Sequence, residues 1–259
     1  MTNCKTERRD SITRCYVPVK KPTVNIKKPN GYILFENDLI VVIATGMVKP
    51  SDNAKTGKMI QIWILVKAEN PVAANKSGAD EAVCGDCPLR GINGAERVCY
   101  VNLGQAPLGI WKAWQRGSYP KVTPELMKSF MDLKVRFGAY GEPVKMPHNI
   151  VKMIAELSAN WTGYTHQWRN PIFDGYKQFF MASADKASDV AKANAKGWRT
   201  FRQLVDGEKP LASEIICPNY TKGVQCESCG LCKGASIGAK NIAIYSHGSG
   251  KKHFTKVRG

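Results

Sequence analysis

Runs of apolar, β-branched residues alternate with polar stretches along most of the chain. Two of these runs, residues 39–44 and 59–66, have the length and composition of strands. A turn-rich stretch, residues 49–57, separates them, so the pattern predicts a β-hairpin. The basic, proline-containing residues 1–30 come before it and predict an extended arm.

Beyond Cys99, strand-like runs alternate with helical stretches. The strand candidates are residues 134–138, 161–165, 178–182, 198–202, 214–217 and 241–245. The helix candidates in this region are 123–130, 147–159 and 188–196, and a further short helix is expected before Cys99, at residues 71–81. This alternation predicts βα units and a mainly parallel sheet. We therefore expect an α/β fold, (βα) barrel-like but open or incomplete, with an N-terminal β-hairpin. This fold, including the hairpin and the cysteine groups, is expected to form a single domain over residues 31–250. The basic arm precedes the domain, and a basic tail, residues 251–259, follows it.

Polar, reactive side chains follow nearly every predicted strand. They are Glu142, His166, Asp185, Arg202, Cys217 and His247. Ligands of α/β sheets and barrels bind at the carboxyl edge of the strands, so these residues predict one shared functional site. Taken alone, His166 is equally explained by a buried hydrogen bond, and Asp185 by a helix cap.

Seven of the nine cysteines form two groups. The first group is Cys84, Cys87 and Cys99, and the second is Cys217, Cys226, Cys229 and Cys232. C-x2-C spacing lets neighbouring thiolates face one metal centre, so both groups are predicted to bind zinc or an iron–sulfur cluster, with a slight preference for iron–sulfur. There are three alternatives to a metal centre on each group. The two groups could share one site, the cysteines could be buried free thiols, or they could form disulfides. An odd cysteine count without a secretion signal argues against disulfides.

The net charge of +17 predicts a polyanionic partner, most plausibly nucleic acid. Aromatic and basic residues interleave in two places, where rings can stack on bases and cations can hold phosphates: Trp111, Trp114, Arg116, Trp168 and Arg169. Core packing is the alternative role for these aromatic rings. The chain has no run of eighteen apolar residues and no apolar signal region, so we expect no membrane span and a cytoplasmic protein.

The segment Gly138-Ala-Tyr-Gly-Glu142-Pro143 resembles the Gly-Gly-Glu-Pro motif of radical-SAM barrels, which follows the second strand. Together with Cys84-Gly-Asp-Cys87-Pro, Val98-Cys-Tyr-Val-Asn and the final cysteine run, it makes roughly residues 55–250 similar to a family of bacteriophage and mobile-element proteins described as radical-SAM-like. The resemblance implies that Gly141, Glu142 and Pro143 hold the amino group of S-adenosylmethionine. It implies no established reaction.

The resemblance further implies a [4Fe–4S] cluster on Cys84, Cys87 and Cys99 with one iron open, and an auxiliary cluster or structural zinc on the four-cysteine run. His166, Asp185, Arg202 and His247 would position substrate or move protons, in an enzyme acting on nucleic acid or a nucleotide in the host cytoplasm. The first group is spaced C-x2-C-x11-C, whereas the family uses C-x3-C-x2-C. The alternative function is a non-catalytic, zinc-braced nucleic-acid-binding protein in phage replication or counter-defence.

Overall fold

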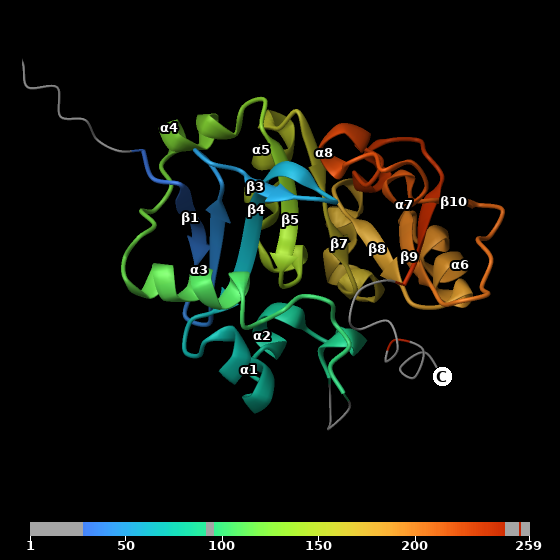
Figure 1. Cartoon of the computed structure of the whole chain (residues 1–259), viewed down its shortest axis with the longest axis horizontal. Coiled ribbons are helices and arrows are strands. Elements are labelled where there is room, and N and C mark those ends of the chain that lie inside the picture. Colours follow the sequence, from blue (N-terminus) through green and yellow to red (C-terminus); the bar gives the residue numbers. More distant parts are fainter. Residues whose placement is uncertain (1–27, 92–95, 247–253, 255–259) are drawn as a thin grey trace, which may run out of the picture.

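The computed structural model describes residues 28–91, 96–246 and Phe254. It shows a mixed α/β protein with two sheets (Figure 1). The first sheet is mixed and has the order β1-β2-β4-β5-β6, with β3 paired to β4; the second is parallel throughout, with the order β10-β11-β9-β8-β7. The predicted α/β class is confirmed, and no closed barrel is seen among the described strands. His247, nearly all of the predicted arm and most of the predicted tail lie outside the described residues.

The predicted hairpin is present at the start of the first sheet. β2 (Ile40–Thr45) pairs antiparallel with β4 (Gly57–Val66). Two strands that the pattern did not predict extend it, β1 (Gly31–Glu36) beside β2 and the short β3 (Ser51–Asn53) beside β4. Because β2 and most of β4 are buried, these two strands form the centre of the apolar core.

Every strand predicted beyond Cys99 has a counterpart in the structure. These are β5 (Lys134–Tyr140), β6 (Asn160–Thr162), β7 (Tyr164–Thr165), β8 (Met181–Ala184), β9 (Thr200–Leu204), β10 (Glu214–Ile216) and β11 (Asn241–Tyr245). Among the described residues, β5 pairs in parallel with β4, and every ladder between two strands from β5 to β11 is parallel, as predicted.

One chain segment joins the two sheets. β6 pairs with β5 in the first sheet, whereas β7 pairs with β8 in the second, and only Gly163 separates β6 from β7. A Cβ atom at Gly163 would come within 2.5 Å of the Phe180 ring, so a glycine is needed where this ring packs against the backbone. The carboxyl ends of β5 and β8 are thereby brought close to the end of β7.

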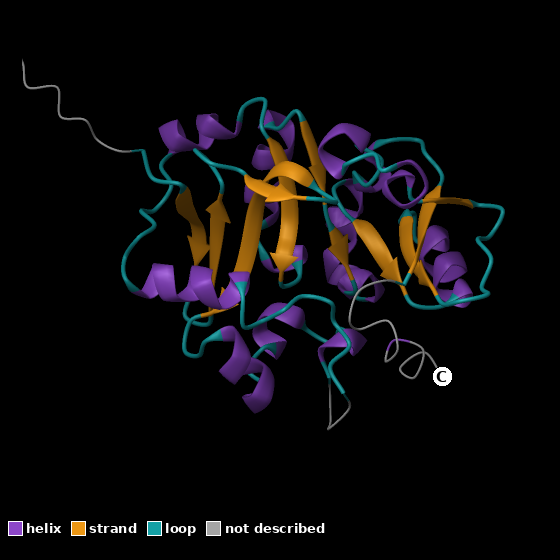
Figure 2. Cartoon of the chain, viewed as in Figure 1, coloured by secondary structure: helices purple, strands orange, loops and turns teal. Residues whose placement is uncertain are grey.

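The helices surround the strands and form no separate bundle (Figure 2). They are α1 (Pro71–Ser77), α2 (Glu81–Cys84), α3 (Ala106–Gln115), α4 (Pro124–Met127), α5 (His148–Leu157), α6 (Ala187–Ala195), α7 (Pro218–Lys222) and α8 (Cys226–Cys229), with 3-10 turns η1 (Pro88–Arg90), η2 (Lys128–Phe130), η3 (Pro143–Lys145), η4 (Gln167–Arg169), η5 (Pro171–Gln178) and η6 (Gly234–Ser236). Within the described residues, no helix has the length and apolar character needed to cross a membrane.

Candidate metal centre

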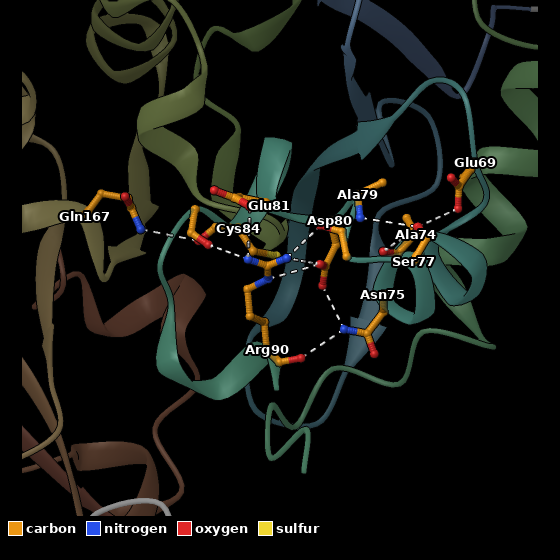
Figure 3. A network of polar contacts seen from close by, with 12 residues as sticks. Glu69, Ala74, Asn75, Ser77, Ala79, Asp80, Glu81, Cys84, Arg90 and Gln167 are labelled. Carbon is orange, nitrogen blue, oxygen red and sulfur yellow. Dashed lines mark hydrogen bonds and ion pairs between the residues drawn. The ribbon is translucent and has the colours of Figure 1, made fainter. Parts of the chain in front are cut away.

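The loop that carries Cys84 and Cys87 is held by one buried arginine. Cys84 is the last residue of α2 and Cys87 directly precedes η1. Arg90 Nε donates to Asp80 at 3.0 Å, and its two terminal nitrogens donate to the carbonyls of Gly85 and Gly78 at 3.0 and 2.8 Å (Figure 3). Both charged side chains are buried, so this ion pair fixes the path of the C-x2-C loop.

The turn after β5 places Glu142 beside this loop. Gly141 has φ +82°, and a Cβ atom there would lie 2.8 Å from Ile64, so the turn passes directly over β4. The amide of Glu142 donates to the carbonyl of Val83 at 2.8 Å, which ties the turn to the residue before Cys84. The Gly-Glu-Pro motif and the first cysteine group therefore adjoin.

Cys87, Glu142 and His166 form a buried group whose ligand atoms all lie within 4.8 Å of one another, and it can hold a metal ion. His166 Nδ1 lies 3.3 Å from Cys87 Sγ and 3.5 Å from Glu142 Oε1. His166 Nε2 lies 3.3 Å from Asp185 Oδ1, which orients the ring as carboxylates do behind metal-bound histidines. The same chain of thiol, imidazole and carboxylate can also carry a proton.

The charge state of His166 follows from these neighbours. Burial by itself lowers the pKa of His166, but Cys87, Asp185 and Glu142 together raise that pKa well above its ordinary value. The Glu142 carboxylate also accepts hydrogen bonds from the Thr165 hydroxyl and from the amide of His166. These neighbours favour the protonated imidazole, and a metal ion bound at Nδ1 would displace the proton there.

Cys84 and Cys99 lie near this group but are not among the residues whose ligand atoms lie within 4.8 Å of one another. Burial, followed by the neighbouring Cys87 and Glu142, raises the pKa of Cys84, and burial likewise raises the pKa of Cys99. The hydroxyl of Tyr140 is buried, has no hydrogen-bond partner among the described residues, and is influenced electrostatically by Cys84 and Cys99. The thiols of Cys84 and Cys99 near this hydroxyl fit a bound metal centre that would accept its hydrogen bond.

The four cysteines of the second group meet at a separate place. Cys217, Cys226, Cys229 and Cys232 all line one cavity of about 20 Å³, next to Thr162 and Tyr164. All seven cysteines in the described part of the chain are free thiols, so the disulfide alternative fails for them. The cavity of the second group contains no cysteine of the first.

Asp185 also lines a larger cavity beside the Cys87 group. The volume of this cavity is about 510 Å³, which suits a small organic ligand. Its wall contains Phe254 and six charged side chains, which are Asp86, Arg169, Asp185, Lys186, Asp189 and Lys192. The loops after β4, β7 and β8 supply most of them, as expected for the carboxyl edge of a parallel sheet.

Other residues predicted from the sequence lie in different surroundings. Arg202 is fully buried, and its guanidinium is bound by Glu214, Glu208 and the carbonyl of Lys209, so its donors are used within the fold. Trp168 is 1% exposed and donates to the Ser183 carbonyl, which leaves no ring face free for a base.

The first aromatic stretch lies on α3. Trp111 and Trp114 are half-buried and pack against the core, and Trp111 donates to the carbonyl of Val66 at 2.9 Å. Arg116 is exposed. Arg169 lies over the Trp168 ring and pairs with Asp189 at 3.1 Å.

No protein-family model, curated protein or solved structure matches this chain.

The sequence predicted Glu142, His166 and Asp185, and the structure brings these three together. The sequence did not single out Arg90, Tyr140 or Lys192, because a buried arginine, a core phenol and a surface lysine carry no motif. Arg90 follows Cys87 by three residues, and that proximity to a cysteine loop was the only signal available.

Proposed function

We propose that this protein is a metal-dependent enzyme of the radical-SAM-like kind. Cys84, Cys87 and Cys99 would hold an iron–sulfur cluster, and Glu142 would bind the amino group of S-adenosylmethionine. The observation that carries the proposal is the buried contact of Cys87 with Glu142 and His166 at the carboxyl ends of the strands. The unpartnered Tyr140 hydroxyl supports it, because a cluster sulfide is a hydrogen-bond acceptor.

If Cys84, Cys87 and Cys99 held a reduced cluster and Glu142 held S-adenosylmethionine, these groups would supply radical chemistry to a substrate. The chain itself binds and orients. A carboxylate has about four acceptor positions, and the Thr165 hydroxyl and the His166 amide leave room on Glu142 for an ammonium group. His166, between Cys87 and Asp185, is placed to hold a proton at Nε2.

The cavity beside the centre supports a nucleotide or a nucleic-acid terminus as substrate. Each acid in its wall has a partner: Asp86 accepts from Gln167, Asp185 contacts His166, and Asp189 pairs with Arg169. Lys186 and Lys192 are exposed and form no ion pair within the described residues. The three acids and three cations of this wall balance formally, but the two lysines are its cations without an ion pair in the described part of the chain, so they can contact an anionic ligand such as a phosphate ester.

Binding of S-adenosylmethionine to anaerobically prepared protein tests the proposal. Glu142→Gln removes a charge-assisted hydrogen bond, so affinity should fall about tenfold or more in equilibrium dialysis. Glu156→Gln, in an exposed ion pair on α5, is the matched control and should bind as the wild type does. Equal binding by Glu142→Gln, or no binding by the wild type with its cluster intact, would refute the proposal.

The net charge of +17 favours a second candidate, a zinc-braced protein that binds nucleic acid without catalysis. Its affinity for single-stranded DNA should fall steeply with salt. It should also survive Glu142→Gln and His166→Ala, because neither residue would touch the strand. Loss of DNA binding in both variants at constant salt would argue against this candidate.

A further inference from the structure

The cysteine lobe, defined as residues 217–232, has no apolar core of its own. Its two short helices, α7 and α8, contain no buried residue. Helices of five and four residues do not persist in water without external support. All four of its cysteines nevertheless line one cavity, which lies between this lobe and β6, β7 and β11. Small units that lack a core are commonly held by a metal, because metal binding then supplies the free energy of folding.

The backbone of the lobe is anchored on the sheet side. The carbonyls of Cys226 and Glu227 both accept from Asn160 Nδ2, at 3.1 Å each, at the start of β6. Buried Arg199 donates to the carbonyls of Leu231 and Gly234 at 2.9 and 2.8 Å. These contacts fix the chain on both sides of Cys229, so the positions of the thiols are defined by the surrounding fold.

A second set of contacts joins the lobe to the β3–β4 hairpin. The amides of Cys226 and Glu227 donate to the carbonyls of Lys55 and Thr56 at 3.1 and 3.0 Å. In return, the amide of Lys58 donates to Glu227 Oε2 at 3.1 Å, across a sequence separation of 169 residues. Figure 1 shows the blue hairpin reaching the red segment that contains α8. Gly57 has φ +73°, and a Cβ atom there would lie 2.5 Å from Glu227.

The cavity suits a thiolate-bound metal in size and in charge. A volume of about 20 Å³ is room for one small occupant. Four thiolates around a divalent ion carry a net charge of about −2. Lys55 and Arg136 are both close enough to Cys226 to act on it electrostatically, and their positive charges offset that excess.

We propose that Cys217, Cys226, Cys229 and Cys232 bind one thiophilic metal centre through four thiolates, and that this centre fastens the turn between β3 and β4 to the cysteine lobe. The centre is separate from the Cys87 group, because its cavity contains no cysteine of the first group. Its role is structural: it orders α8, and α8 in turn holds residues 53–58 through the Lys55, Thr56 and Lys58 contacts. The proposal does not depend on the reaction at the first group.

Metal analysis of the full chain, combined with hydrogen exchange, tests this. Cys226→Ser/Cys229→Ser should lose the second centre, whether zinc or iron with sulfide, and amide exchange in residues 53–58 should rise at least tenfold. Ser228→Ala, within the same helix, should change neither. A double variant that keeps its full metal content would overturn the site, and unchanged exchange after metal loss would overturn the fastening role.

A second measurement covers the case in which the double variant does not fold. Co²⁺ added to the metal-free wild-type chain should give the absorption of a tetrahedral thiolate site, and residues 53–58 should gain protection at the same metal concentration. Glu227→Ala should keep the Co²⁺ spectrum yet lose that protection. Absence of thiolate-to-metal absorption in a variant lacking Cys84, Cys87 and Cys99 would overturn the proposal, while leaving the proposed function untouched.

Discussion

The Tyr140 hydroxyl offers a test of the metal centre proposed on Cys84, Cys87 and Cys99. Its side chain is 4% exposed, and its hydroxyl has no hydrogen-bond partner among the described residues. A buried hydroxyl left unpaired costs about 1–3 kcal/mol. The thiols of Cys84 and Cys99 act on it electrostatically, so a centre bound by these thiols would meet the hydroxyl and supply its acceptor.

Tyr140→Phe should therefore have opposite effects on the metal-free and metal-loaded protein. In the metal-free protein it removes an unpaired group, and the free energy of unfolding should rise by about 1 kcal/mol in urea titrations. In the metal-loaded protein the same substitution should lower the free energy of unfolding. Tyr176→Phe is the control: its hydroxyl donates to the Met146 carbonyl, so its loss should destabilise both forms. Destabilisation of the metal-free protein by Tyr140→Phe would contradict this account.

At the scale of elements, the loop between α2 and η1 depends on the ion pair of Asp80 and Arg90. Both side chains are under 10% exposed, and Asn75 Nδ2 also donates to the second oxygen of Asp80 at 2.8 Å. Figure 3 shows Arg90 at the centre of this network, with Cys84 beside it. A buried guanidinium that loses its carboxylate remains charged in a poorly solvated place.

Asp80→Ala should lower the free energy of unfolding by about 3 kcal/mol and reduce the metal bound by the first group. Chemical denaturation and metal analysis measure the two effects. Glu156→Ala breaks an exposed pair with Lys152 and should change stability by less than about 0.5 kcal/mol. Comparable losses in the two variants would show that the Asp80 pair is not the main support of the loop.

Most strands were predictable because their apolar runs are long enough to show a pattern. β4 and β5 are examples, and β11 has the boundaries that the pattern predicted. The predicted strand 178–182 begins three residues before β8, because Phe179 and Phe180, which lie between the 3-10 turn η5 and β8, have the composition of a strand. The break at Gly163 could not be predicted, since it depends on a contact with Phe180.

The candidate site was predictable where residues follow strands in sequence. Glu142, His166 and Asp185 meet because parallel neighbours bring their carboxyl ends together. Arg202 lies within β9 and not after it. It pairs with Glu208, in the loop after β9, and with Glu214, the first residue of β10, and no local pattern predicts these contacts. The burial of Trp168 likewise depends on packing against the neighbouring strand.

At the scale of the whole molecule, the order of parallel strands places the 510 Å³ cavity next to the Cys87 group. Asp185 lines this cavity and contacts His166 of that group, which makes the cavity the natural place for a substrate. Lys186 and Lys192 supply its unpaired positive charge. A ligand that carries a phosphate should therefore bind more tightly than the same ligand without one.

Adenosine monophosphate and adenosine are suitable probes for this difference. Lys186→Ala/Lys192→Ala should weaken binding of the monophosphate about tenfold, by loss of two charge-assisted contacts, and leave adenosine binding unchanged. Lys128→Ala, exposed on η2, is the matched control. Calorimetric titration measures all three. Equal loss for both probes would mean that the lysines shape the cavity but do not recognise phosphate.

The proposed metal centre on Cys84, Cys87 and Cys99 can be measured by metal content and visible absorption of protein prepared without oxygen. We expect iron and acid-labile sulfide in the wild type, with the broad visible absorption of a thiolate-bound cluster. Both should be lost from Cys84→Ser/Cys87→Ser and kept in Cys226→Ser/Cys229→Ser if the second centre holds zinc. A colourless wild-type protein free of iron and sulfide would contradict the proposal.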